Sequence, residues 1–164
     1  MTKEEFQVYR KKYAKQIDEI RAAAHELHDS VNQIYGDGLP YGFHLDMVVE
    51  AVEEFGHLVC VSEDDMIPLF FGAFFHDTIE DTRQSYNDVM RRARKWMTEE
   101  QALMATEIVY ALTNDKGLHV LSGQERNTIK VYARYPMPRL SSSVTVCPTS
   151  LIVAPLTTAD VVKG

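Results

Sequence analysis

A long apolar run, Met66 to Phe75, leads directly into the polar sequence His-Asp-Thr-Ile-Glu-Asp-Thr at residues 76–82. A segment that is apolar on nearly every face predicts a helix buried at the centre of a helical domain. Burying a histidine and several carboxylates at the end of such a helix is costly unless a metal ion or ion partners compensate them. This junction therefore constrains both the fold and the chemistry of the chain.

Two amphipathic helices are predicted before the apolar run, because apolar residues recur there every three or four positions. The first extends from Lys3 to about Val31, and the sequence Gly36–Pro40 breaks it. The second begins near Gly42 and is expected to end at Gly56, since glycine is common at helix C-termini.

Two helix-capping patterns follow the apolar run. Ser85, with an aspartate three residues later, opens a short helix that ends near Trp96. Thr98, with a glutamine three residues later, opens a helix through Leu112, and Asn114–Gly117 is predicted as a loop. The predicted fold class is therefore all-α, a helical bundle.

Composition limits the class of protein. A chain of 164 residues is one domain of ordinary size, and a net charge of −7 argues against a general nucleic-acid binder. No apolar run approaches the roughly 20 residues that span a bilayer, and the acidic start of the chain is unlike a signal peptide. Cys60 and Cys147 make no framework of disulfides. We expect a cytoplasmic protein that binds neither nucleic acid nor membrane.

The composition changes abruptly after Arg126. Residues 1–126 hold 13 basic and 23 acidic side chains, whereas residues 127–164 hold four basic side chains and one acid, Asp160. The second segment also contains four of the six prolines and shows no helical period. The sequence predicts a helical domain over residues 1–126 and an atypical tail over residues 127–164, irregular or disordered.

The candidate site combines two stretches of the chain. His76 and Glu80 are four residues apart, as are Asp77 and Asp81, so each pair shares one stripe of a helical turn. His44 lies on the inward edge of the second predicted helix. Imidazole nitrogens and carboxylate oxygens suit a divalent first-row ion such as Mn²⁺ or Fe²⁺. Such an ion makes hydroxide available near neutral pH, a neighbouring carboxylate can take a proton, and phosphate esters or anhydrides are natural substrates.

Other interpretations of the same residues stay open. A single histidine such as His44 on an apolar face is often a hydrogen-bonded core residue, and Glu80-Asp81 could be a solvated helix end. The remaining histidines are interpreted as core or surface residues: His25, His28, His57 and His119. The combination of a buried helix, a His-Asp pair and a Glu-Asp pair one turn later is what favours a metal site.

Residues 76–82 closely resemble the HD and ED motifs of the hydrolase domain of RelA/SpoT proteins and their small stand-alone relatives. The upstream sequence is similar as well, since Pro40-Tyr41 precedes His44 as a Pro-Tyr precedes the first ligand histidine of that family. Thr113–Lys116 resembles the segment after a later family helix. The resemblance covers roughly residues 24–117.

This resemblance implies an HD-domain helical bundle in which His44, His76 and Asp77 bind Mn²⁺. Glu80 and Asp81 would orient or activate the attacking water. The implied reaction is hydrolysis of the 3′-diphosphate of guanosine tetra- or pentaphosphate, and the partner is that small nucleotide. Lys116 is a candidate phosphate contact. Many HD proteins cleave other phosphate esters, so another nucleotide or ester is an alternative substrate.

The chain departs from the family at one metal ligand. The family places a fourth ligand, an aspartate, in a late helix that reads approximately KLxDRLxN, and no such string occurs here. Asp160 is the one acid of the tail and stands in a different sequence, and Asp115 stands in a loop. The chain is therefore either a phosphohydrolase with an incomplete ligand set or a nucleotide-binding remnant without activity.

The genetic code suggests a reason for the departure. Tyr135–Ser150 can be encoded by codons that, read from the third base, give Pro-Tyr-Ala-Pro-Phe-Val-Lys-Leu-Cys-Asp-Arg-Leu-Ser-Asn-Leu. That string contains the missing motif and its aspartate. We hypothesise a frameshift near Arg126-Asn127, so that the tail is out-of-frame sequence. The alternative is a genuine variable tail, and resequencing the gene distinguishes the two.

Overall fold

The computed structural model describes residues 1–113, 144–147 and 150–155. The fold is all-α, as the sequence predicts. The helices, in chain order, are α1 Lys3–Lys12, α2 Ala14–Asp29, α3 Gly42–Phe55, α4 Met66–Phe75, α5 Thr78–Asp81, α6 Tyr86–Ala93 and α7 Glu99–Leu112. Two short 3₁₀ turns join them, η1 Gly56–Leu58 and η2 Glu63–Asp65. The short strands are β1 Ile34–Tyr35, β2 Leu39–Pro40, β3 Val144–Cys147 and β4 Ser150–Pro155.

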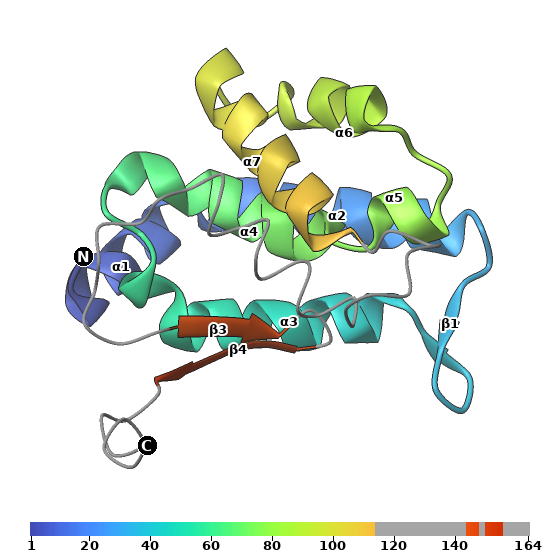
Figure 1. Cartoon of the computed structure of the whole chain (residues 1–164), viewed down its shortest axis with the longest axis horizontal. Coiled ribbons are helices and arrows are strands. Elements are labelled where there is room, and N and C mark those ends of the chain that lie inside the picture. The colour runs from blue at the N-terminus through green and yellow to red at the C-terminus, as the bar shows by residue number, and fades with distance from the viewer. Residues whose placement is uncertain (114–143, 148–149, 156–164) are drawn as a thin grey trace, which may run out of the picture.

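Helix α4 is the centre of the bundle. It packs against α7 on one side and α3 on the other, and α2 also lies against it (Figure 1). Every residue of α4 except Leu69 is buried. The predicted central helix is confirmed, with the bounds that the apolar run indicates.

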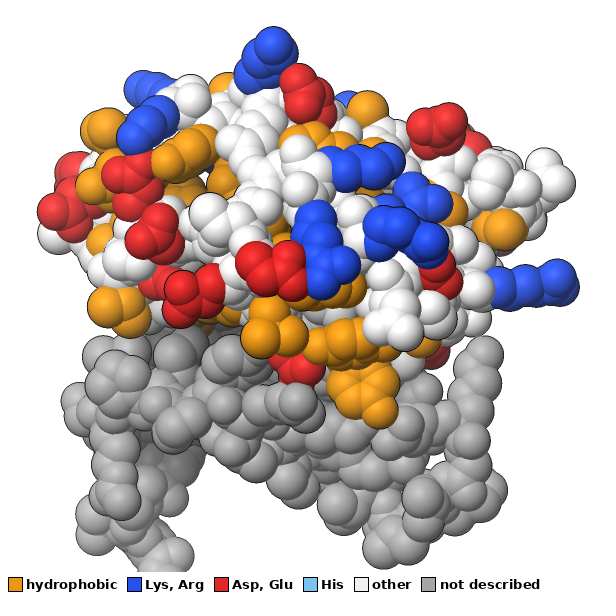
Figure 2. Space-filling view, turned by 90° about the horizontal axis from the view of Figure 1, so that it is seen from above, with side chains coloured by type: hydrophobic (Ala, Val, Ile, Leu, Met, Phe, Trp, Pro, Cys, Tyr) orange, Lys and Arg blue, Asp and Glu red, His pale blue; other side chains and the backbone are white. Residues whose placement is uncertain are grey.

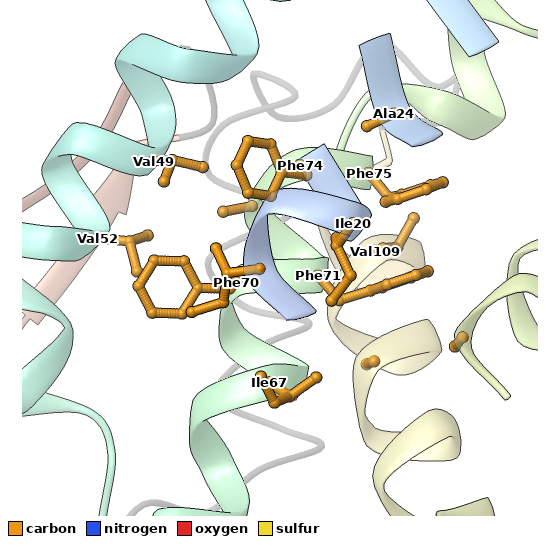
Figure 3. Close-up of a cluster of buried hydrophobic side chains, with 14 of the residues drawn as sticks. Ile20, Ala24, Val49, Val52, Ile67, Phe70, Phe71, Phe74, Phe75 and Val109 are labelled. Carbon is orange, nitrogen blue, oxygen red and sulfur yellow. The ribbon is translucent and has the colours of Figure 1, made fainter. Parts of the chain in front are cut away.

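The core forms because the large side chains of α4 point to opposite neighbours. Phe70 and Phe74 lie towards α3, whereas Phe71 and Phe75 lie towards Val109 of α7 (Figure 3). Residues four apart share a helix face, so two phenylalanine pairs fill the two interfaces. The rings of Phe71 and Phe75 stack with centroids 4.2 Å apart. This packing fixes the position of the helix end that carries His76.

The capping patterns position the later helices. Ser85 and Asp88 form a capping box at the start of α6, and Thr98 and Gln101 form one at the start of α7. Each box satisfies amide groups that a helix start leaves without partners. Helix α7 ends at Leu112 as predicted, but α6 ends at Ala93, about a turn before the predicted end.

The predicted single helix over residues 3–31 is wrong in one respect. The chain forms α1 and α2, with a break at Tyr13, whose backbone leaves the helical region (φ −98°, ψ 11°). The apolar spacing continues across the break because Tyr13 still packs against the core. Helix α3 ends before Gly56 as predicted. The backbone of Gly56 nevertheless stays in the right-handed helical region, and Gly56 is the first residue of η1.

Two small antiparallel sheets accompany the helices. β1 pairs with β2 across the segment that breaks the first helical region, with Gly36 and Gly38 at positive φ in the turn. β3 pairs with β4, and β4 lies alongside α3 (Figure 1). The sequence analysis does not anticipate β3 and β4. The rest of the predicted tail, and the domain boundary after Arg126, lie outside the described residues.

The described surface carries charges of both signs. Figure 2 shows Lys and Arg side chains beside Asp and Glu on one face. Arg94 pairs with Glu99, and Arg91 pairs with Asp88 within α6. Such exposed pairs are screened by solvent and contribute little to stability. Among the described residues, no helix has both the length and the apolar character needed to cross a bilayer.

Candidate metal centre

The end of α4 creates the candidate site. His76 is the last residue in the helical path of α4, and Asp77 turns the chain into α5 with a backbone near ψ 0°. The turn allows two adjacent side chains, which diverge on a regular helix, to approach a common point. His44, in the first turn of α3, faces that point from the neighbouring helix. The sequence-predicted ligands His44, His76 and Asp77 therefore come together.

The three side chains converge through one atom each. The Nε2 atoms of His44 and His76 are 3.2 Å apart. The Oδ2 atom of Asp77 lies 3.2 Å from His44 Nε2 and 2.8 Å from His76 Nε2. Both histidines are buried and Asp77 is half-buried. Two imidazole nitrogens and one carboxylate oxygen thus share a small volume with little access to water.

The hydrogen bond on the far side of His76 fixes its tautomer. Nδ1 lies 2.8 Å from the carbonyl oxygen of Ala73, which can only accept, so Nδ1 carries a proton and donates it. In the neutral ring, Nε2 therefore keeps its lone pair, which points towards His44 Nε2 and Asp77 Oδ2. This arrangement is usual for a metal-binding histidine, whose second nitrogen donates to a carbonyl or carboxylate.

His44 lacks the same support among the described residues. Its Nδ1 is buried and has no hydrogen-bond partner there. The ring is instead held by stacking on Tyr35, with ring centroids 5.1 Å apart and planes 18° apart. The ring of Tyr35 on one side, and His76 and Asp77 near Nε2 on the other, fix the direction of His44 Nε2.

The pKa shifts of His76 and Asp77 favour a positive charge beside the carboxylate. Burial alone would lower the pKa of His76, but the hydrogen bond and charge of Asp77 outweigh it and raise that pKa. Burial alone would raise the pKa of Asp77, but hydrogen bonds from His44 and His76 hold it far below its usual range. A proton on His76 Nε2 satisfies the carboxylate, and a divalent cation bound to the same three atoms would do so with greater charge.

Tyr41 belongs to the site, although the sequence analysis assigns it no role of its own. Its hydroxyl lies 2.5 Å from Asp77 Oδ2 and 3.1 Å from Asp81 Oδ2, and it donates to these carboxylates. Burial, together with the two carboxylates, raises the pKa of Tyr41, so the phenol keeps its proton. The sequence signal was its position three residues before His44, which is one helical turn.

His28 is the second residue whose position the sequence did not reveal. It is fully buried, its ring stacks on Tyr41 with centroids 4.6 Å apart, and Nδ1 lies 2.8 Å from Gln33 Oε1. Burial lowers the pKa of His28, so the neutral ring is favoured. Its position four residues after Ala24, on the buried stripe of α2, was the available signal.

The predicted acid–base residues take different positions. Asp81 and Asp77 both contact the hydroxyl of Tyr41, which lies between their carboxylates. Glu80 is half-buried on α5, and its negative charge helps to raise the pKa of His76. Lys116, the candidate phosphate contact, lies outside the described residues, as do Asp115 and Asp160. The described part of the chain therefore provides three candidate ligands, His44, His76 and Asp77.

Two surface hollows of the described structure lie away from this site. One, near the first turn of α4, is lined by residues that include Tyr13, Ile67 and Trp96. The other lies between η2 and α7 and is lined by Asp64, Leu103 and other residues. Neither is lined by His44, His76 or Asp77.

Comparisons with protein-family models, with curated proteins and with solved structures find no match to this chain.

Proposed function

We propose that this chain is a metal-dependent phosphohydrolase whose substrate is a guanosine nucleotide with a 3′-diphosphate. The observation that carries the proposal is the convergence of His44 Nε2, His76 Nε2 and Asp77 Oδ2 at the end of a buried helix, all within 4.8 Å of one another. The substrate class comes from the resemblance of residues 24–117 to the RelA/SpoT hydrolase domain. The proposed ion is Mn²⁺, since two imidazoles and a carboxylate suit a first-row divalent cation.

The donor set fits such an ion. Because Nδ1 of His76 donates to the Ala73 carbonyl, loss of the Nε2 proton leaves the tautomer that binds metal, and Asp77 is held as the carboxylate. When bound, the ion would supply Lewis acidity and lower the pKa of coordinated water. The two histidines and Asp77 would hold it, and Asp81 and Glu80 would take the proton of the attacking water or orient it.

A second candidate is a nucleotide-binding protein that holds metal weakly and does not turn over substrate. The observation that favours it is the ligand count, because the described residues bring three ligands together and the expected late aspartate is not among them. Losing one carboxylate reduces both charge balance and geometric constraint at the ion. Hydrolysis of another nucleotide or phosphate ester is the third possibility, which follows from the breadth of HD chemistry.

Metal content and product release test these functions together. The purified chain is measured for bound metal and for pyrophosphate release from guanosine tetraphosphate with added Mn²⁺. His76→Ala is the test variant, and His57→Ala is the control, because His57 is away from the site and its Nδ1 bonds only the local carbonyl of Glu54.

The phosphohydrolase proposal expects about one metal per chain and pyrophosphate release, both lost in His76→Ala and retained in His57→Ala. Metal binding without release from any phosphate ester supports the binding protein. Release from other esters but not from guanosine tetraphosphate changes the substrate and keeps the reaction class. No bound Mn²⁺ in the unaltered chain rejects the metal centre.

A further inference from the structure

We propose that Tyr41 is a positioning residue that holds the metal ligand Asp77 and the proton acceptor Asp81 at a fixed separation. This inference rests on the proposed function, because it assigns a role within the same site. It goes beyond that function by naming a group outside the three candidate ligands that sets the geometry of the reaction.

The ring of Tyr41 is held on several sides. It is 9% exposed and stacks on His28 with an interplanar angle of 15°. The ring of His44 packs against it nearly edge-on, with centroids 5.3 Å apart, and Tyr35 does so at 6.5 Å. A ring packed this way has little freedom to move as a whole, so its hydroxyl occupies one position relative to α3 and α5.

That position lies between two carboxylates. The hydroxyl is 2.5 Å from Asp77 Oδ2, the same oxygen that approaches both histidine nitrogens. A hydrogen bond to a ligating carboxylate fixes its orientation and leaves the remaining lone pair for the metal. The same hydroxyl is 3.1 Å from Asp81 Oδ2. One phenol group thus sets where the ligand points and how far the acceptor stands from it.

A structural role alone would be simpler, since a buried carboxylate needs a donor whatever its function. The two roles differ in what they change. A structural hydroxyl affects stability and leaves a folded site with normal chemistry. A positioning hydroxyl affects metal affinity through Asp77, and it affects turnover at saturating metal through Asp81.

The test variant is Tyr41→Phe, which removes the hydroxyl and keeps the stacked ring. The matched control is Tyr86→Phe, because the hydroxyl of Tyr86 also donates to a carboxylate, Glu107 Oε1 at 2.6 Å, outside the metal centre. Mn²⁺ affinity, kcat and KM are measured for both variants after circular dichroism confirms folding. We expect Tyr41→Phe to bind Mn²⁺ about 10–100-fold more weakly, and to keep a reduced kcat with unchanged KM at saturating Mn²⁺.

A double-mutant cycle with Asp81→Asn tests how Tyr41 acts. If Tyr41 affects turnover by holding Asp81, the double variant has the same kcat as Asp81→Asn alone at saturating Mn²⁺. Additive losses in kcat would overturn this part of the inference. Tyr41→Phe with the same Mn²⁺ affinity and kcat as Tyr86→Phe would overturn it entirely while leaving the proposed function in place.

Two outcomes separate this inference from the proposal on which it rests. If the unaltered chain binds no Mn²⁺, the proposed function fails first and the positioning role fails with it. If Tyr41→Phe does not fold, 3-fluorotyrosine at position 41 alone replaces it, because fluorine changes the donor strength of the phenol and keeps the hydroxyl. Mn²⁺ affinity should then change with the label at position 41 and not at position 86, and equal affinities would overturn the inference.

Discussion

His76 shows how one side chain connects the fold to the chemistry. Its Nδ1 is bound to the carbonyl of Ala73, one turn back along α4, and its Nε2 faces Asp77 and His44. The sequence and its family resemblance singled out His44, His76 and Asp77, and the structure brings these three side chains together. The sequence did not identify Tyr41 or His28, because their roles depend on contacts between segments that are distant along the chain.

The raised pKa of His76 predicts how metal binding depends on pH. A proton on Nε2 competes with the metal, and the charge of Asp77 keeps that proton on the ring to a higher pH than in an ordinary histidine. Mn²⁺ affinity should therefore increase as pH rises through and above about 6.5, the usual histidine value. Calorimetric titrations in buffers of different ionisation enthalpy would measure the proton released. Affinity that stays constant between pH 6 and 8, with no proton release, would contradict this account.

Cys60 should be chemically silent in the folded protein. Its side chain is 2% exposed, and burial, assisted by the charge of Asp65, raises the pKa of the thiol to about 12. Because the thiolate is the reactive form, alkylation at pH 8 should be negligible until the protein unfolds. Peptide-resolved mass spectrometry after iodoacetamide treatment separates Cys60 from Cys147. Rapid modification of native Cys60 would show that this part of the core opens.

At the scale of elements, local signals predicted the helices whose boundaries depend on local chemistry. The boxes at Ser85 and Thr98 start α6 and α7 where the sequence indicated. The break at Tyr13 was missed because apolar spacing reports which residues face the core and not whether the backbone between them is continuous. The residues of a helix that face the core were therefore easier to predict than a break in its backbone.

The contact between α4 and α7 gives a direct test of packing. A Cβ added at Gly72 would lie 2.5 Å from Cγ2 of Ile108, a β-branched side chain with little freedom to move away. Overpacking of this kind costs about 1–3 kcal/mol, whereas alanine gains about 1 kcal/mol over glycine in a helix. Gly72→Ala should therefore lower the free energy of unfolding by about 1 kcal/mol, measured by urea denaturation.

A double variant distinguishes overpacking from other causes. Ile108→Ala removes the clashing methyl group, so Gly72→Ala should be neutral or stabilising in that background. Equal destabilisation in both backgrounds would show that the cost does not arise at the α4–α7 contact.

At the scale of the whole molecule, the chain divides into a helical body and a segment whose composition differs. Within the described part of the body, His44, His76 and Asp77 come together. The sequence predicted the body well because helix periodicity and caps are local properties. The pairing of β3 with β4 was not anticipated, although Val144–Cys147 contains the β-branched residues typical of strands, because the tail was interpreted from its proline and serine content.

The frameshift hypothesis makes a prediction about the whole chain. A version with the shifted frame restored after Arg126 would contain the late aspartate that the family uses as its fourth ligand. We expect it to bind Mn²⁺ more tightly than the chain as given, because a fourth ligand adds negative charge and geometric constraint, and to release pyrophosphate faster. Metal titration and the nucleotide assay compare the two chains. Equal affinity and equal activity would show that the late aspartate plays no part.

The most direct test of the metal centre is the anomalous scattering of a crystal grown with Mn²⁺. Data collected above and below the manganese absorption edge locate the ion independently of any assumption about its ligands. The account predicts one strong peak within coordination distance of His44 Nε2, His76 Nε2 and Asp77 Oδ2. A crystal that shows no peak there, with His76 Nε2 still hydrogen-bonded to Asp77, would contradict it.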